Sequence, residues 1–531
     1  MILVAAHSVG THRAGLRALD WAVIGLYAAT LVFIGWRASR KHSTTHDYFI
    51  GRSGFGSFTI GISMFVTLFS TISYLSGPGE VIRYGPGVYF GLLISVPFAF
   101  PLIAYWLLPT LMKRRVLSLY QLFEYTLGPR IRTLGACMFL VYRTVWMGVL
   151  LHFASEALSV IFGVGPAWIP VITIATGAIV IIYTSLGGLR AVITADVLQF
   201  FVLFIGALAS IAVVTIWFGG FQWFPTKWNP AWPKQPVFST DLTVRLTWVG
   251  VALQIILVNV AHGVDQTQVQ RYMASAELPR ARRAVLTRLL GEAAVWTLLA
   301  PLGLALVSFY QRFPGSMPEG QTIQTYADQL FPFFIAHELP VGLSGLVVAG
   351  ILAAGMSSID SGINAFTAVV LNDFVDRRGV RQKTDAEHKR FAMLLAVAIG
   401  VCVVTFSLFV GWVPGNYYEI AARTIRLFIP LELGVVLLAL FVRFATPFGV
   451  VWGIIYGFVL GVLISYWTSF TGRTGISFTL YVPCILMIQM ITSCLFSFIP
   501  ARRFSRSQVL LTSALLAAVL AAVVIVALRS C

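Results

Sequence analysis

Long apolar stretches, separated by short polar segments, follow one another along nearly the whole chain. A transmembrane helix needs about 20 predominantly apolar residues, and fourteen stretches are long enough to meet that need. They lie near residues 18–37, 58–82, 87–111, 133–162, 166–186, 191–219, 243–264, 283–311, 338–371, 391–413, 417–443, 447–468, 476–499 and 508–528. The pattern predicts an all-α polytopic membrane protein with about 14 transmembrane helices.

Composition supports a membrane protein and narrows the classes of function. Of the 531 residues, 58% are hydrophobic and 11% are charged, and mean hydropathy is +0.86; soluble domains carry about 25% charged residues. The five cysteines show no spacing typical of a metal site. No nucleotide-binding loop, HExxH or GxSxG motif and no sizeable extramembrane domain is evident, so we do not expect an enzyme.

The positive charges occur in every second loop. The basic segments contain Arg37, Arg40, Lys41 and Arg52; Lys113, Arg114, Arg115, Arg130 and Arg132; Arg271, Arg280, Arg282, Arg283 and Arg288; Arg377, Arg378, Arg381, Lys383, Lys389 and Arg390; and Arg502, Arg503 and Arg506. Such loops face the cytoplasm, so the net charge of +17 indicates orientation in a lipid bilayer rather than nucleic-acid binding. With fourteen crossings, both termini of this plasma-membrane or inner-membrane protein are expected outside the cytoplasm. No obligate protein partner is evident.

The second predicted span, "IGISMFVTLFSTISYLSGPGEVIRYG", is unusually rich in hydroxyl groups and includes Thr67 and Ser70. Serine and threonine can satisfy backbone groups that become free where a membrane helix unwinds. Interrupted helices of this kind form ion and substrate sites in secondary transporters. The alternative is close packing of intact helices through small residues.

The stretch "AAGMSSIDSGIN" places polar side chains in another apolar span. Ser357 and Ser361 are four residues apart, and so are Asp360 and Asn364, which puts them on one face of a helix. Hydroxyl and carboxylate oxygens are ligands for hard cations. A small-cation site is therefore favoured over a helix contact in which Asp360 is neutral or paired with an arginine.

Other ionisable residues also fall within predicted spans, where they are candidates for function or for pairing with one another. They are Arg143, Glu156, Asp196, Glu292, Arg423, Arg426 and Glu432. Arg143 is a candidate for an anionic substrate, because a guanidinium binds a carboxylate through two hydrogen bonds. Glu156 and Glu432 are interpreted as structural. His262 is either a buried core residue or a substrate contact.

Five motifs occur in a characteristic order: "HDYFIGRS", the broken span that ends in "EVIRYG", "YTSLGGLRAVITADVLQFF", "GVDQTQVQRYMAS" and "AAGMSSIDSGINA". Together they resemble the sodium:solute symporter family, which has the LeuT fold. The resemblance implies alternating access driven by sodium. It also implies two inverted five-helix repeats at 58–219 and 243–443, joined by a Trp- and Pro-rich extracellular loop at 220–242. The segments 1–57 and 444–531 would carry additional helices.

The resemblance also implies roles for individual residues. The sodium site shared across the family would use the carbonyls of Val66, Phe69 and Ala354 and the hydroxyls of Ser357 and Ser358. A second cation site would use Asp196, Asp360 and Ser361, where Asp360 replaces a hydroxyl. These two carboxylates could hold another cation, share a proton or pair with an arginine.

The substrate implied is a small organic solute, with a monocarboxylate or other organic anion favoured over a sugar. Its candidate contacts are Thr67, Ser70, Arg143, His262, Arg423 and Arg426. One or two sodium ions would be coupled to it. The alternatives are a proton-coupled symporter of the same fold, and a transporter-like sensor or channel without coupled transport.

Overall fold

The computed structural model describes residues 15–40, 48–49, 54–113, 118–275, 277–378, 384–411, 417–499 and 510–517, with the backbone alone at 417–425. Within these ranges the regular elements are helices and none is a strand. The first half contains α1 (Ala18–Ser39), α3 (Ser57–Leu68), α4 (Thr71–Tyr84), α5 (Gly87–Pro101), α6 (Leu108–Lys113), α7 (Leu119–Leu127), α8 (Pro129–Ile161) and α9 (Ile169–Trp217). The second half contains α10 (Trp248–His262), α11 (Gln266–Ala274), α12 (Leu278–Arg312), α13 (Ala327–His337), α14 (Leu343–Val369), α15 (Asp385–Val410), α16 (Tyr417–Phe441), α17 (Pro447–Ser465), α18 (Trp467–Thr471) and α19 (Tyr481–Ser497).

The described residues contain nine helices that are long and apolar enough to cross a membrane. Two bent helix pairs, α3 with α4 and α10 with α11, raise the number to eleven. The predicted count of fourteen is therefore not confirmed. One span of 52 residues, Pro166–Trp217, is kinked at Gly188, which has a φ of 53°. This kink lies between the predicted spans 166–186 and 191–219.

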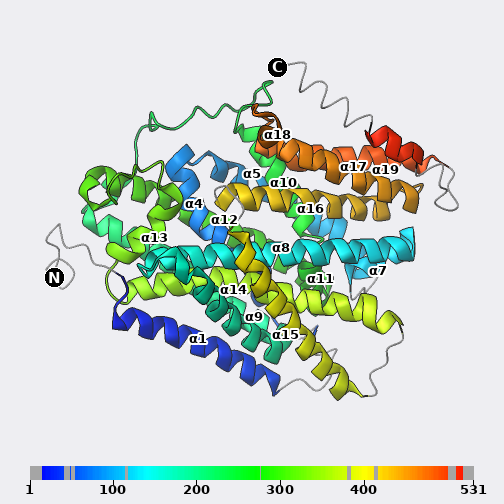
Figure 1. The fold of residues 1–531 in the computed structure, drawn as a ribbon, viewed down its shortest axis with the longest axis horizontal. Coiled ribbons are helices and arrows are strands. Elements are labelled where there is room, and N and C mark those ends of the chain that lie inside the picture. The colour runs from blue at the N-terminus through cyan, green and yellow to red at the C-terminus, as the bar shows by residue number, and fades with distance from the viewer. Residues whose placement is uncertain are drawn as a thin grey trace.

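α14 occupies the centre of the helix bundle and packs against α1, α4, α8, α9 and α15. Two glycines let its neighbours approach closely. A Cβ atom at Gly345 would lie 2.6 Å from the backbone of Asp20 in α1, and one at Gly355 would lie 2.5 Å from the Thr71 hydroxyl in α4. Figure 1 shows α17 and α19 on one side of the bundle and α1 on the opposite side.

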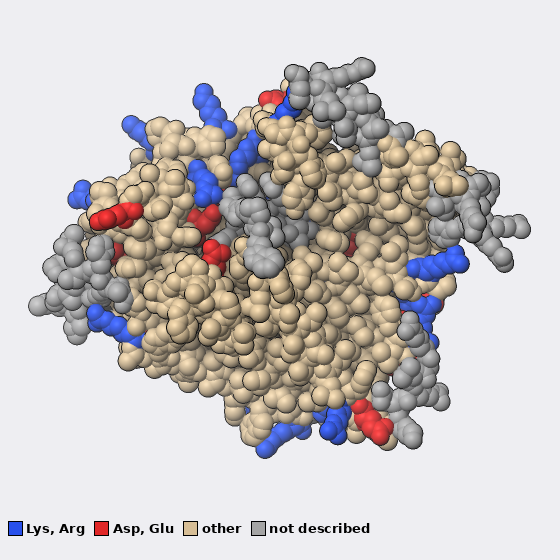
Figure 2. All heavy atoms as spheres, viewed as in Figure 1, with Lys and Arg blue, Asp and Glu red and all other residues tan. Residues whose placement is uncertain are grey.

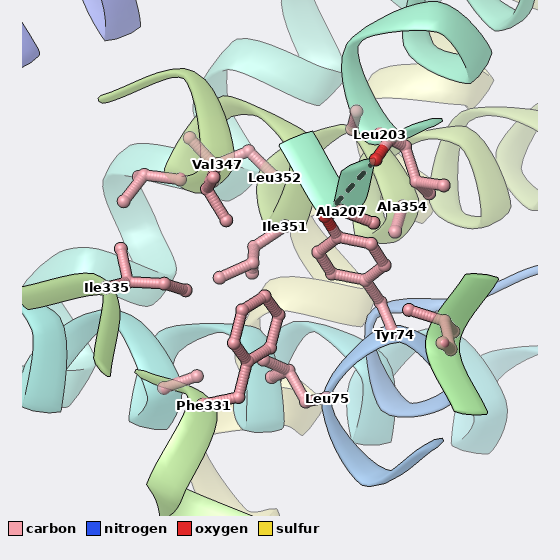
Figure 3. Packing of buried hydrophobic residues seen from close by; sticks show 14 of the residues in the cluster. Tyr74, Leu75, Leu203, Ala207, Phe331, Ile335, Val347, Ile351, Leu352 and Ala354 are labelled. Carbon is pink, nitrogen blue, oxygen red and sulfur yellow. Dashed lines mark hydrogen bonds between the residues drawn. The ribbon is translucent and has the colours of Figure 1, made fainter. Parts of the chain in front are cut away.

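A second set of contacts holds α4 in place after the bend that separates it from α3. The Tyr74 hydroxyl donates to the carbonyl of Leu203 in α9 over 3.2 Å, as the dashed line in Figure 3 shows. The ring of Tyr74 also lies edge-on to that of Phe331 in α13, with centroids 5.8 Å apart. Ile351 of α14 belongs to the same apolar cluster. The direction of α4 is thus fixed by three other helices.

The outer surface of the bundle is apolar. Large hydrophobic side chains such as Phe90, Tyr105 and Val171 are exposed on it. In Figure 2, most Lys and Arg side chains of the visible face lie towards its edges, and the broad lower middle is largely uncharged. This surface is the one that a multi-pass membrane protein needs, because lipid tails offer no partners for charged groups.

Candidate functional site

The first feature of the site is the break between α3 and α4. The two helices are bent by 68° relative to each other. Phe69 and Ser70 have extended backbone angles at the break, and the Ser70 hydroxyl caps α4 by accepting from the Ser73 amide over 3.3 Å. A helix end leaves its last carbonyls without helical partners. The hydroxyl-rich sequence predicted this break, and Pro78 and Gly79 of the same stretch lie within α4.

The carbonyls at the end of α3 face two serines of α14. The Ser357 hydroxyl donates to the Val66 carbonyl over 3.0 Å. The Ser358 hydroxyl lies 2.9 Å from the Thr67 carbonyl and 3.4 Å from that of Phe69. All five residues are almost completely buried. Oxygen atoms from two helices thus converge on one point inside the bundle.

Ala354 completes this group, because its carbonyl lies 3.2 Å from the Ser357 hydroxyl. The structure therefore brings together the five residues expected to form the shared sodium site. A hydroxyl group can rotate its hydrogen away and turn a lone pair towards a cation. Carbonyl and hydroxyl oxygens are suitable ligands for a hard cation such as sodium.

A guanidinium group lies among the residues expected to form the second cation site. Arg271 of α11 is fully buried, and its Nη2 lies 3.1 Å from the Asp196 carboxylate and 2.7 Å from the Ser361 hydroxyl. Its Nε donates to Ser63 over 2.7 Å, and the Ser63 hydroxyl donates to Asp196 over 2.5 Å. The negative charge of Asp196 is thus balanced by an arginine of the protein.

Asp360 lies outside that ion pair. Its Oδ2 accepts a 2.6 Å hydrogen bond from the Tyr183 hydroxyl of α9. Its Oδ1 is buried and has no hydrogen-bond partner among the described residues, and the same is true of Asp196 Oδ1. The two carboxylates and Arg271 together leave one negative charge uncompensated when all three are ionised.

A cavity of about 210 Å³ borders the α3–α4 break. Its wall includes side chains from α4, α5, α8, α10, α12 and α16. Five of the predicted substrate contacts line it: Thr67, Ser70, Arg143, His262 and Arg426. The side chain of the sixth, Arg423, lies outside the described residues. Because Phe69 lines the cavity and also presents its carbonyl to Ser358, the cavity and the shared sodium site have a common wall.

Arg143 is held at the second break in the fold. α10 and α11 are bent by 58°, and Asp265 caps α11 by accepting from the Thr267 amide over 2.8 Å. The same carboxylate lies 3.2 Å from Arg143 Nη2. Arg143 Nε is buried and has no partner among the described residues. The residue therefore has a carboxylate partner within the protein and a further donor available.

Arg271 and Arg288 contradict the loop assignment made from the sequence. The charge pattern places both among the basic residues of a cytoplasmic loop, although the predicted span 283–311 includes Arg288, and both are fully buried. α11 has no long apolar run, yet it is the second half of a bent span, and α12 begins ten residues before Arg288 at Leu278. The acidic residue one helical turn after Arg288, Glu292, was the available signal that this part of α12 lies inside the protein.

A membrane protein whose described elements are all helical, with two broken helices, a cluster of buried carbonyl and hydroxyl oxygens at one of them and a charged cavity beside it, has the construction of a secondary transporter. The chain belongs to the sodium:solute symporter family, whose family model matches residues 48–457. The family inferred from the motifs is confirmed, and the protein is a symporter rather than an enzyme.

Several characterised relatives resemble the chain. The sodium/sialic acid symporter SiaT of Proteus mirabilis is 25% identical over 396 residues, which cover 72% of this chain and 76% of the relative. The sodium-dependent multivitamin transporter of Oryctolagus cuniculus is 29% identical over 360 residues, which cover 66% of this chain and 54% of the relative. The sodium-coupled monocarboxylate transporter 1 of Homo sapiens is 27% identical over 368 residues, which cover 67% and 56%.

Solved structures confirm the fold. A substrate-bound, outward-open Na⁺-coupled sialic acid symporter superposes with a TM-score of 0.77 at 22% identity, covering 91% of this chain and 98% of the other. The nucleobase-cation-symport-1 transporter Mhp1 superposes with a TM-score of 0.51 at 10% identity, covering 87% and 96%. The all-helical, LeuT-like fold class is thus the one expected from the motifs.

Proposed function

We propose that this protein is a sodium-coupled secondary active symporter that imports a small organic anion by alternating access. The observation that carries the proposal is the convergence of the Ser357 and Ser358 hydroxyls on the carbonyls at the α3–α4 break. That break also lines the cavity. A change in the angle between α3 and α4 would therefore alter the sodium site and the solute site together.

Sodium-driven uptake into proteoliposomes tests this function. The solutes are sialic acid and short monocarboxylates, supplied with an inward sodium gradient, with an inward proton gradient, or with neither. We expect accumulation above equilibrium with the sodium gradient alone. If the solute accumulates only with the proton gradient, the protein is a proton-coupled symporter instead. If solute uptake never exceeds equilibrium, the protein is a channel.

Replacement of Arg143 by alanine is expected to weaken solute binding much more than sodium binding. A hydrogen bond to a charged group contributes about 1.5–3 kcal/mol, so half-maximal uptake should need about tenfold to a hundredfold more solute. Kinetics in separate titrations of solute and sodium measure both effects. Arg143→Lys is the control that keeps the charge beside Asp265. Equal solute affinity in wild type and Arg143→Ala would remove Arg143 from the solute site.

We also propose that a second cation, if transported, binds at Asp360. Arg271 already compensates the charge of Asp196, whereas Asp360 accepts a hydrogen bond from the neutral Tyr183 hydroxyl. One sodium per monoanion carries no net charge, but two cations per monoanion carry one positive charge. An inside-negative potential should then stimulate uptake by the wild type and have little effect on Asp360→Asn. If the membrane potential does not change the wild-type uptake rate of a monoanion, cotransport of a second cation is excluded.

We infer that the finer membrane topology follows the sequence prediction: fourteen crossings, inverted repeats at 58–219 and 243–443, and both termini outside the cytoplasm. The two bent helix pairs support the repeats, since α3–α4 lies at the start of the first and α10–α11 at the start of the second. Epitope tags at each end, stained on intact cells, test the orientation. If the tags are stained only in permeabilised cells, both termini lie in the cytoplasm and the predicted orientation is wrong.

A further inference from the structure

Arg288 of α12 is a buried arginine on the wall of the cavity. Its Nη2 lies 2.8 Å from the side-chain oxygen of Asn259 in α10 and 3.4 Å from the Asn259 carbonyl. Its Nε and Nη1 are buried without a hydrogen-bond partner among the described residues. Two of the three guanidinium nitrogens are therefore left with unused donors at the edge of a cavity.

Three arginines are fully buried among the described residues, and they differ in how their charge is balanced. Arg143 lies 3.2 Å from Asp265, and Arg271 lies 3.1 Å from Asp196. Arg288 forms no such ion pair within 4.0 Å in the described part of the chain. An unpaired buried charge is unfavourable, because it loses hydration without gaining a partner. Such a charge is characteristic of a site that an external anion completes.

Glu292 is the nearby acidic residue that could serve Arg288 instead of a ligand. It follows Arg288 by one helical turn and lines the same cavity. The charge of Arg288 acts on Glu292, but the two residues form no ion pair within 4.0 Å. The free donors of Arg288 therefore remain available, and the effect of Glu292 can be tested separately.

We propose that Arg288 binds the carboxylate of the transported solute and makes the cavity selective for organic acids over their neutral amides. The inference rests on the proposed symport function and names the residue that makes its cavity selective for an organic anion. A guanidinium suits this role because it is always charged and forms strong hydrogen bonds to carboxylate oxygens. Arg143 already has Asp265 as a partner, whereas Arg288 lines the same cavity with two guanidinium nitrogens that have no hydrogen-bond partner among the described residues.

The experiment compares acids with their amides in wild type and four variants. Sodium-driven uptake of sialic acid and of a short monocarboxylate is competed with the matching amide of each. In the wild type we expect the acid to bind at least about tenfold more tightly than the amide. Arg288→Gln should lose this preference through weaker binding of the acid, with unchanged sodium dependence at saturating solute. Arg288→Lys should retain part of the preference because it retains the charge.

Two further variants separate ligand binding from a structural role. Asn259→Ala removes the hydrogen bond that Arg288 donates to the Asn259 side-chain oxygen but keeps the charge of Arg288, so it should keep the preference for acids. Glu292→Gln should keep or increase the preference, because it removes a negative charge from the cavity. If Arg288 serves only to anchor α10, Asn259→Ala should reduce the preference for acids as much as Arg288→Gln does. If Arg288 serves only to balance Glu292, Glu292→Gln should do so.

Ligand-induced thermal stabilisation of the purified proteins gives the same comparison without transport. A wild type that is stabilised no more by any acid than by its amide would overturn the role of Arg288, even if sodium-driven uptake persists. A preference for acids that is unchanged in Arg288→Gln would also overturn it. Uptake that is independent of sodium would instead contradict the proposed symport, while the acid-to-amide comparison would still decide the role of Arg288.

Discussion

Replacement of both Ser357 and Ser358 by alanine is expected to raise the sodium concentration for half-maximal uptake by about tenfold or more. The double variant removes two of the five oxygen ligands proposed for the shared site. A loss of about 1.4 kcal/mol in sodium binding corresponds to a tenfold change. Sodium titration of uptake at saturating solute measures the effect. Solute affinity should fall mainly when sodium is limiting, because the coupling between two ligands is reciprocal.

The control for this variant is Thr367→Ala. Thr367 is a buried hydroxyl residue of the same helix, but it donates only to the Ile363 carbonyl one turn earlier, over 2.7 Å. It should leave the sodium response unchanged. A sodium response that is the same in wild type and in Ser357→Ala/Ser358→Ala would show that these hydroxyls are not sodium ligands.

Replacement of Arg271 by glutamine is expected to destabilise the protein strongly. The change leaves Asp196 buried with the Ser63 hydroxyl as its remaining hydrogen-bond donor among the described residues. Removing one partner of a buried ion pair costs about 3–5 kcal/mol, a large part of the 5–15 kcal/mol that typically holds a folded protein together. Thermal unfolding in detergent should show a lower midpoint and a smaller folded fraction.

A second substitution distinguishes this explanation from a general loss of packing. In Asp196→Asn/Arg271→Gln both charges are gone, so the double variant should be more stable than Arg271→Gln alone. The difference between the double variant and the sum of the single variants measures the coupling of the pair. Effects that simply add, or an Arg271→Gln protein as stable as wild type, would contradict the importance of this ion pair.

The sequence contained most of the information about the break between α3 and α4 and about the polar face of α14, whereas the individual sodium ligands came from the family resemblance. Hydroxyl groups in an apolar span indicated a break, and the structure has one at Phe69 and Ser70. The three-and-four-residue spacing of Ser357, Asp360 and Ser361 indicated one polar face. These features could be predicted because they depend on residues that are close together in the chain.

The charged partners could not be predicted in the same way, because they depend on long-range packing. Arg271 meets Asp196, which lies 75 residues earlier in the chain. Arg288 of α12 forms a hydrogen bond with Asn259 of α10. The charge pattern assigns Arg271 to a polar loop, since it cannot show that the short polar helix α11 lies inside the bundle. It also groups Arg288 with that loop, although Arg288 falls within the predicted span 283–311. The two residues that most change the account of the site were therefore found only in the structure.

In the proposed function, sodium and the organic anion move together through the site at the α3–α4 break. The most direct test loads proteoliposomes with potassium, imposes an inward gradient of the transported acid, and measures uptake of ²²Na⁺ present at equal concentration on both sides. We predict transient ²²Na⁺ accumulation in the wild type and much less in Ser357→Ala/Ser358→Ala at the same low sodium concentration. Solute uptake by the wild type without any accompanying ²²Na⁺ movement would contradict coupled transport of sodium and the organic anion.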